Sequence, residues 1–78
     1  MFSLDRITAD PQVLGGKACI RGMRISVSLV VNLVANGMDT VAIPREYPDL
    51  EAEDVHQALR YAAWTADDAV YMPLRAPA

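Results

Sequence analysis

The chain has 78 residues, of which 53% are hydrophobic, and a net charge of −3 at pH 7. This length allows one small domain, whose solitary core would be marginally stable. A single cysteine (Cys19) excludes an intrachain disulfide, and one cysteine with one histidine argues against a structural zinc site. We therefore expect no metal, no cofactor and no small-molecule substrate. Because so small an interior cannot bury this much apolar material, we predict a homodimer or a higher homo-oligomer.

Residues 1–10 already carry three charged side chains and lack the apolar core of a signal peptide. The longest strongly apolar stretch, residues 27–34, is interrupted by Ser28 and Asn32 and is too short to span a bilayer. These features predict a cytoplasmic protein without membrane contact.

Residues 1–25 are predicted to form a short β arm. Turn signals at Asp10-Pro11, Gly15-Gly16 and Gly22 separate brief extended pieces at residues 6–8, 19–20 and 24–25. Strands this short are not stable alone, so they must pack on the helices or pair with another chain.

A first helix is predicted over residues 27–36, with Ser26 as its N-cap and Gly37 ending it. Ser28, Asn32 and Asn36 form one thin polar stripe, and the rest of the surface is apolar. We expect this helix and the β arm to form the dimer interface, through Ile7, Leu29, Val30, Leu33 and Val34. Four valines lower the helix propensity, so a strand remains an alternative.

A short second helix, residues 40–47, follows Asp39 as its cap and is weakened by Pro44. The third helix begins at Asp49 or Glu51. Its buried stripe is predicted to comprise Val55, Ala58, Leu59, Ala62, Ala63 and Ala66. Together these elements predict a mainly α fold: a homeodomain-like three-helix (helix-turn-helix) core at 26–68, preceded by the β arm. Residues 1–68 form the domain, and 69–78 form an extended tail.

Several ordered motifs carry a family resemblance. They are Arg6-Ile7-Thr8-Ala9-Asp10-Pro11, Gly15-Gly16-Lys17, Ile20-Arg21-Gly22-Met23-Arg24-Ile25, Asn36-Gly37-Met38, Tyr47-Pro48-Asp49-Leu50, Glu53-Asp54-Val55 and Ala58-Leu59-Arg60-Tyr61-Ala62-Ala63. In this combination the chain resembles the family catalogued as domain of unknown function 433, over about residues 4–66. That family is similar to VapB-type antitoxins encoded beside PIN-domain-like ribonuclease toxins. The resemblance implies a homeodomain-like fold, toxin sequestration, and operator binding by dimers.

The sequence departs from the family pattern at Ala18, Met23 and Ser26, where Pro, Thr and Pro are commoner, and at Pro44. The first three changes soften the turns. Pro44 weakens the first helix of the helix-turn-helix pair and therefore argues against DNA binding.

Charge is distributed unevenly along the chain and bears on the predicted partners. Lys17, Arg21 and Arg24 give the β arm a cationic cluster, which is our candidate contact for operator DNA. The alternative is that Arg21 and Arg24 are structural and bond turn carbonyls or the acidic third helix. The start of that helix is rich in carboxylates, which phosphates would repel.

The candidate toxin-binding residues combine apolar anchors with one cation, which suits a nuclease whose active site is lined by carboxylates. They are Tyr61, Trp64, Tyr71, Met72, Leu74 and Arg75. The alternatives are ordinary packing for Tyr61 and Trp64, and disorder or docking on its own domain for the tail.

No arrangement of residues favours catalysis, because His56 and Cys19 have no evident catalytic partners and Gly15-Gly16 lacks the context of a phosphate-binding loop. We expect a non-enzymatic antitoxin that neutralises a PIN-like ribonuclease toxin. The alternatives are a stand-alone DNA-binding regulator without a toxin and a pure interaction module.

Overall fold

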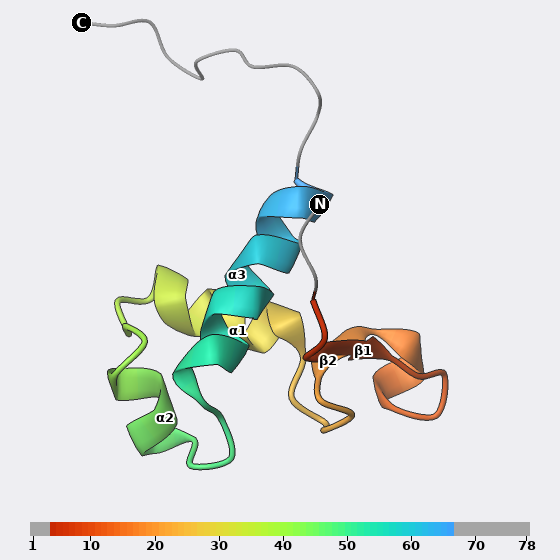
Figure 1. The fold of residues 1–78 in the computed structure, drawn as a ribbon, viewed down its shortest axis with the longest axis horizontal. Coiled ribbons are helices and arrows are strands. Elements are labelled where there is room, and N and C mark those ends of the chain that lie inside the picture. Colours follow the sequence, from red (N-terminus) through yellow and green to blue (C-terminus); the bar gives the residue numbers. More distant parts are fainter. Residues whose placement is uncertain (1–3, 67–78) are drawn as a thin grey trace, which may run out of the picture.

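The computed structural model describes residues 4–66, which form a two-stranded hairpin followed by three helices. The elements are β1 (Ile7–Ala9), a 3₁₀ turn (Leu14–Gly16), β2 (Ala18–Ile20), α1 (Val27–Ala35), α2 (Ala42–Glu46) and α3 (Ala52–Thr65). In Figure 1 the hairpin lies on one side of the first turns of α3, α2 lies on the other, and α1 crosses behind α3. The predicted mainly helical fold with an N-terminal hairpin is confirmed.

The hairpin is antiparallel and pairs Ile7 with Ile20, Thr8 with Cys19 and Ala9 with Ala18. The extended piece predicted at 24–25 is wrong as a strand, because only one further bridge forms, between Cys19 and Ser26. The turn after β2 carries positive φ angles at Arg21 (45°) and Gly22 (72°). The Gly22 N–H donates a hydrogen bond to Thr8 Oγ1 at 2.8 Å, which connects this turn to strand β1.

The first helix begins at Val27 as predicted and ends at Ala35, one residue earlier than predicted, and the alternative of a strand is wrong. Ser26 Oγ accepts a hydrogen bond from the Leu29 N–H at 3.0 Å, which satisfies one of the free donors of the first turn. Gly37 follows the helix with a φ of 101°, a value that favours glycine. The polar stripe of Ser28, Asn32 and Asn36 is exposed.

The second helix is shorter than predicted, because α2 covers only Ala42–Glu46. Asp39 caps the start of this segment as predicted, because its Oδ1 accepts hydrogen bonds from the N–H groups of Val41 and Ala42 at 3.0 and 2.8 Å. Pro44 lies in the first turn, where a backbone N–H has no partner within the helix. A proline is therefore tolerated there.

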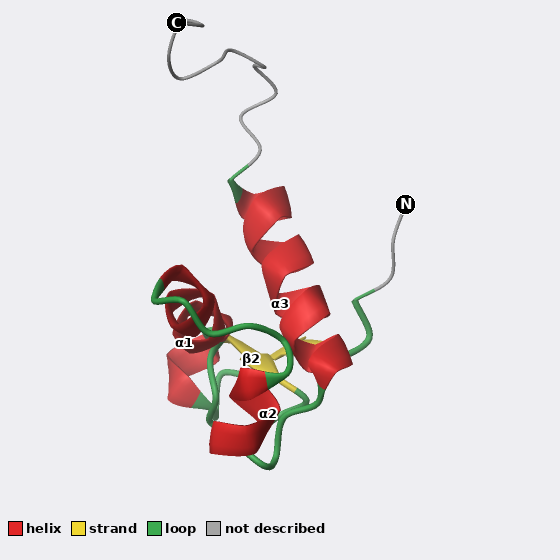
Figure 2. Ribbon diagram, turned by 90° about the vertical axis from the view of Figure 1, so that its left-hand side faces the viewer, coloured by secondary structure: helices red, strands yellow, loops and turns green. Residues whose placement is uncertain are grey.

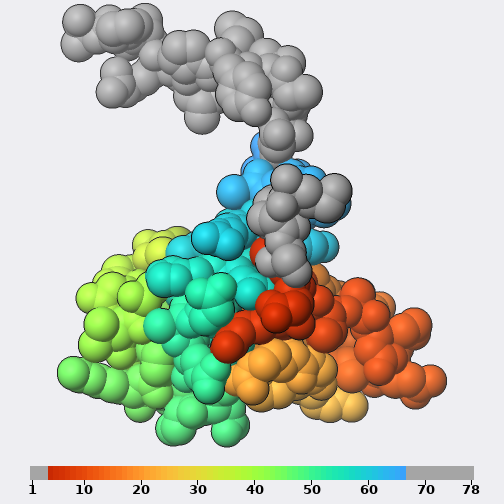
Figure 3. All heavy atoms as spheres, viewed as in Figure 1, coloured from red at the N-terminus to blue at the C-terminus, as the bar shows by residue number. Residues whose placement is uncertain are grey.

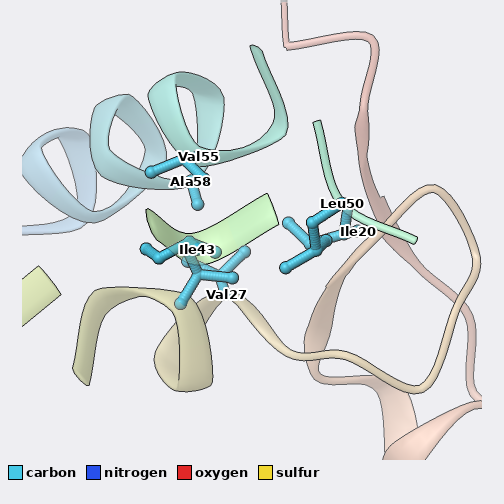
Figure 4. Close-up of a cluster of buried hydrophobic side chains, with 7 residues drawn as sticks. Ile20, Val27, Ile43, Leu50, Val55 and Ala58 are labelled. Atoms are coloured by element: carbon cyan, nitrogen blue, oxygen red, sulfur yellow. The ribbon is translucent and has the colours of Figure 1, made fainter. Parts of the chain in front are cut away.

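Every helix and strand β2 contribute to one core (Figure 4). Its buried members are Ile20, Val27, Val30, Ile43, Leu50, Val55 and Ala58. Val30 has no exposed surface in this chain, so the described fold uses it in the core, and its role as a dimer contact stays a prediction. Ile7, Leu33 and Val34 are half-buried against the same core, and Leu29 is also half-buried. Tertiary packing within one chain therefore takes up much of the apolar surface that we had assigned to a second copy.

The predicted stripe of α3 is buried only in its first half. Val55 and Ala58 are buried and Leu59 and Ala62 half-buried, whereas Ala63 and Ala66 are exposed. Figure 2 shows the reason: the C-terminal turns of α3 extend beyond α1 and α2, so nothing in the described part of the chain covers them.

Candidate functional site

Asp54 lies at the start of α3 with none of its side chain exposed, although it is an ionisable residue. Its carboxylate accepts hydrogen bonds from Arg21 Nε and Nη2 at 3.0 and 2.9 Å and from Arg6 Nη1 at 3.1 Å. It also accepts from the Glu51 N–H at 2.7 Å as part of a capping box that opens the helix. A buried carboxylate with these partners is fully satisfied, and it joins the hairpin to α3.

Gln57, one helical turn later, makes a second connection to the N-terminal segment. The side chain is 4% exposed, and its Oε1 accepts from the Arg6 N–H at 2.9 Å. Its Nε2 donates to Asp5 Oδ1 at 2.8 Å and to Glu53 Oε2 at 3.2 Å. The face of α3 that carries Asp54 and Gln57 is therefore directed inward, toward the hairpin.

The electrostatics of this cluster favour ionised Asp54. Burial is the largest single influence and opposes the charged form, but hydrogen bonds from Arg21, the Glu51 N–H and Arg6 outweigh it. The net effect lowers the pKa of Asp54 below its ordinary value. The hydrogen bonds to Glu51 and Asp54 raise the pKa of Arg6, and the hydrogen bond to Asp54 raises that of Arg21. All three groups are therefore charged at neutral pH.

The three predicted DNA contacts of the β arm differ in their surroundings. Arg21 bonds Asp54 and also donates to the backbone oxygen of Asp49 at 2.7 Å. These are the contacts expected of a structural arginine. Lys17 and Arg24 are exposed, and neither forms an ion pair with any residue between 4 and 66. Of the three predicted DNA contacts, only Lys17 and Arg24 are therefore exposed and without an ion pair among residues 4–66.

An open groove of about 500 Å³ lies where the start of β2, the first half of α1 and the last turns of α3 meet. Apolar side chains line it, among them Val27, Val31 and Tyr61, and Lys17, Ser28 and Thr65 add polar groups. Its volume falls in the usual range of ligand pockets, and none of the described residues that line it is acidic.

Trp64 is 61% exposed, more than any other large hydrophobic side chain in residues 4–66. Its ring centroid lies 5.9 Å from that of Tyr61, which lines the groove, with the rings tilted by 46°. In Figure 3 the last turns of α3, drawn in blue, rise above the rest of the domain. Exposed aromatic rings beside a groove are typical of protein-binding surfaces.

The predicted toxin contacts are thus only partly visible. Tyr61 is half-buried and packs against the core, so ordinary packing accounts for part of its role. Trp64 is exposed beside it. Tyr71, Met72, Leu74 and Arg75 lie outside the described residues.

The alternative that Arg21 is structural and bonds the acidic third helix is confirmed by its contacts with Asp54. Our sequence analysis missed Arg6 as a second partner of Asp54, and it missed the part played by Gln57. The spacing of Glu51 and Asp54, three residues apart at the helix start, is a signal for a capping box that our sequence analysis did not use. The partners on the hairpin had no such signal, because Arg6 and Asp54 are 48 residues apart.

Two further observations concern the described part of the chain. No group of three or more His, Cys, Asp or Glu side chains within it is placed to hold a metal ion. None of its helices is long and apolar enough to cross a membrane.

Fold and site together define a small α-helical domain whose N-terminal hairpin is joined to its last helix by buried ionic contacts. The chain belongs to the family described as "Protein of unknown function (DUF433)", whose model matches residues 7–62.

The chain is also similar to two other proteins. The uncharacterized protein y4eO of Sinorhizobium fredii (strain NBRC 101917 / NGR234) is 36% identical over 56 residues, which are 72% of this chain. The chain spans about a quarter of the length of that relative, 25%. The crystal structure of a DUF433 member protein from Anabaena variabilis ATCC 29413 superposes with a TM-score of 0.73 at 33% identity. The match covers 81% of this chain and 62% of the other.

Proposed function

We propose that this protein is a non-enzymatic antitoxin that binds and neutralises a PIN-domain-like ribonuclease toxin. The observation that carries the proposal is the exposure of Trp64 beside Tyr61 and the groove. Most of this indole is exposed, and burying it against a partner would be favourable by roughly 1.5–3 kcal/mol, as for other large apolar side chains. In this view the tail residues Tyr71, Met72, Leu74 and Arg75 extend the same surface, with Arg75 directed at the carboxylates of the nuclease.

A co-purification and growth-rescue assay with the product of a neighbouring PIN-like reading frame tests this function. Trp64→Ala should weaken co-purification at least tenfold, whereas Val41→Ala should leave it unchanged. Val41 is the matched control, because it is 59% exposed but lies just before α2, outside the groove lining. Deleting residues 69–78 should keep the domain folded and abolish neutralisation. Full neutralisation by both the Trp64 variant and the truncated chain would refute the proposal.

A second candidate function is operator binding, either for autoregulation or in a stand-alone regulator. Exposed Lys17 and Arg24 favour it, and a dimer would double these cations. In this view α2 and α3 are a homeodomain-like helix-turn-helix pair. The structure gives little support for sequence recognition by the start of α3 in the major groove of DNA. Asp54 and Gln57 face the interior of the protein, and DNA phosphates would repel the exposed Glu53.

A gel-shift titration with the upstream DNA separates this candidate from the first. Lys17→Ala with Arg24→Ala should abolish binding while the fold is kept. Arg21 is left unchanged in this test, because its loss would disturb the contact with Asp54. Unaltered affinity would exclude the arm as the DNA surface.

A further inference from the structure

The groove has a chemical character that differs from the rest of the molecule. The whole chain carries ten carboxylates against seven lysines and arginines. Among residues 4–66, however, those that line the groove include one cation, Lys17, and no carboxylate. Val27, Val31 and Ala62 give it an apolar lining, and Ser28, Asn32 and Thr65 provide hydrogen-bonding groups. A short peptide segment with a carboxylate beside apolar side chains would match this lining.

The chain itself carries such a segment directly after α3. Residues 67–74 read Asp-Asp-Ala-Val-Tyr-Met-Pro-Leu, two carboxylates followed by apolar side chains. They lie outside the described residues, so the comparison rests on their chemistry and on where α3 ends. We propose that the groove between β2, α1 and α3 is the binding site for residues 67–74 of the same chain.

The reach of the chain supports an intramolecular contact. Thr65 lines the groove, and Asp68 follows it by only three residues, which span at most about 10 Å when extended. Lys17 lines the same groove, so the carboxylate of Asp67 or Asp68 can approach its ammonium group without a long connecting loop. Val70, Tyr71 and Met72 then supply the apolar side chains that Val27, Val31 and Ala62 would contact. So short a connection raises the effective concentration of the segment far above that of a second copy.

This proposal concerns the chain before any toxin is bound, and it is tested on the full chain without a partner, so its outcome does not depend on the proposed function. The reporters are the backbone amide NMR signals of Ser28, Val31 and Asn32, more than thirty residues from the substituted aspartates. Asp67→Lys with Asp68→Lys should shift these signals, and Lys17→Glu should shift them in the same direction. The combined variant with all three substitutions should return them toward their original positions. Each single disruption should lower the bound population roughly two- to fivefold, as expected for an exposed ion pair.

Two further variants separate the contact from general effects of charge. Arg24→Glu should leave the reporter signals in place, because Arg24 is an exposed cation of the hairpin that does not line the groove. Tyr71→Ala should shift them while all charges are kept. If neither the aspartate substitutions nor Tyr71→Ala changed the chemical shifts of the reporter amides, the proposal would be overturned. Shifts that appear only as the protein concentration rises would also overturn it, since the segment would then come from a second copy.

Discussion

The guanidinium group of Arg21 donates from Nε and Nη2 to the two carboxylate oxygens of Asp54, at 3.0 and 2.9 Å. Arg21 belongs to the turn after β2 and Asp54 to the first turn of α3, so this paired contact spans 33 residues of chain. Such bidentate pairs fix direction as well as distance. The contact therefore holds the hairpin at one orientation against α3, and it does so with a residue that the cationic arm would otherwise offer to a partner.

Removing Asp54 should destabilise the domain strongly. Asp54→Ala leaves two arginines facing a buried site, and we expect it to lower the free energy of unfolding by about 2–4 kcal/mol. This loss of unfolding free energy lies toward the lower end of the range for broken buried ion pairs, because Arg6 and Arg21 are partly exposed to water. Urea unfolding followed by circular dichroism measures the change. Glu46→Gln is the control, since this exposed carboxylate has no ion pair within residues 4–66. Equal stability of the two variants would contradict the structural role of Asp54.

The same cluster predicts how stability depends on pH. The pKa of Asp54 is lower in the folded chain than in the unfolded chain, where Asp titrates near its ordinary value of about 3.9. The unfolded state therefore binds more protons as the pH falls through this region. The stabilisation by Asp54 is complete above that value and is lost as the pH falls through the folded pKa.

The urea midpoint should accordingly decline below about pH 4. Asp54→Asn should flatten this decline, because the substituted side chain cannot titrate. Asp39 contributes in the same direction, since the Ala42 and Val41 N–H groups lower its pKa. A decline as steep in the Asp54→Asn variant as in the original protein would show that other carboxylates are responsible.

The three predicted DNA contacts, Lys17, Arg21 and Arg24, should differ in their effect on stability. Lys17→Ala and Arg24→Ala should each change the free energy of unfolding by less than about 0.5 kcal/mol, because both side chains are exposed. Arg21→Ala should cost about 2–3 kcal/mol, since it removes two hydrogen bonds from a buried carboxylate. Thermal unfolding of the three variants side by side provides the comparison. If Arg21→Ala were as mild as the other two, the arginine would be free to serve as a binding residue.

The start of α1 depends on one hydroxyl group. Ser26→Ala should lower the free energy of unfolding by about 1 kcal/mol, because the Leu29 N–H then loses its acceptor. Ser28→Ala is the matched control two residues later, where the exposed hydroxyl bonds only the Ser26 hydroxyl within the described residues. Chemical unfolding should show a clear loss for the first and almost none for the second. The opposite order would mean that the cap has been wrongly identified.

The sequence by itself determined the local features of this protein. Ser26, Gly37 and the polar stripe of α1 were predictable because capping, left-handed backbone and helical periodicity depend on residues within a few positions of one another. The hairpin strands and the mainly helical fold followed from the same short-range rules. The family was recognisable because ordered motifs survive along the chain.

Only the tertiary structure decided which of these side chains are exposed and able to contact a partner. Val30 looked like an interface residue because the periodicity of α1 is the same whether its apolar face meets α3 or a second chain. Arg21 looked like a DNA contact because its buried partner is 33 residues away. Sequence spacing does not specify which distant elements pack together. The burial of Val30 therefore became visible only with α1 placed against α3, and the choice of Asp54 as the partner of Arg21 only with the hairpin placed against α3.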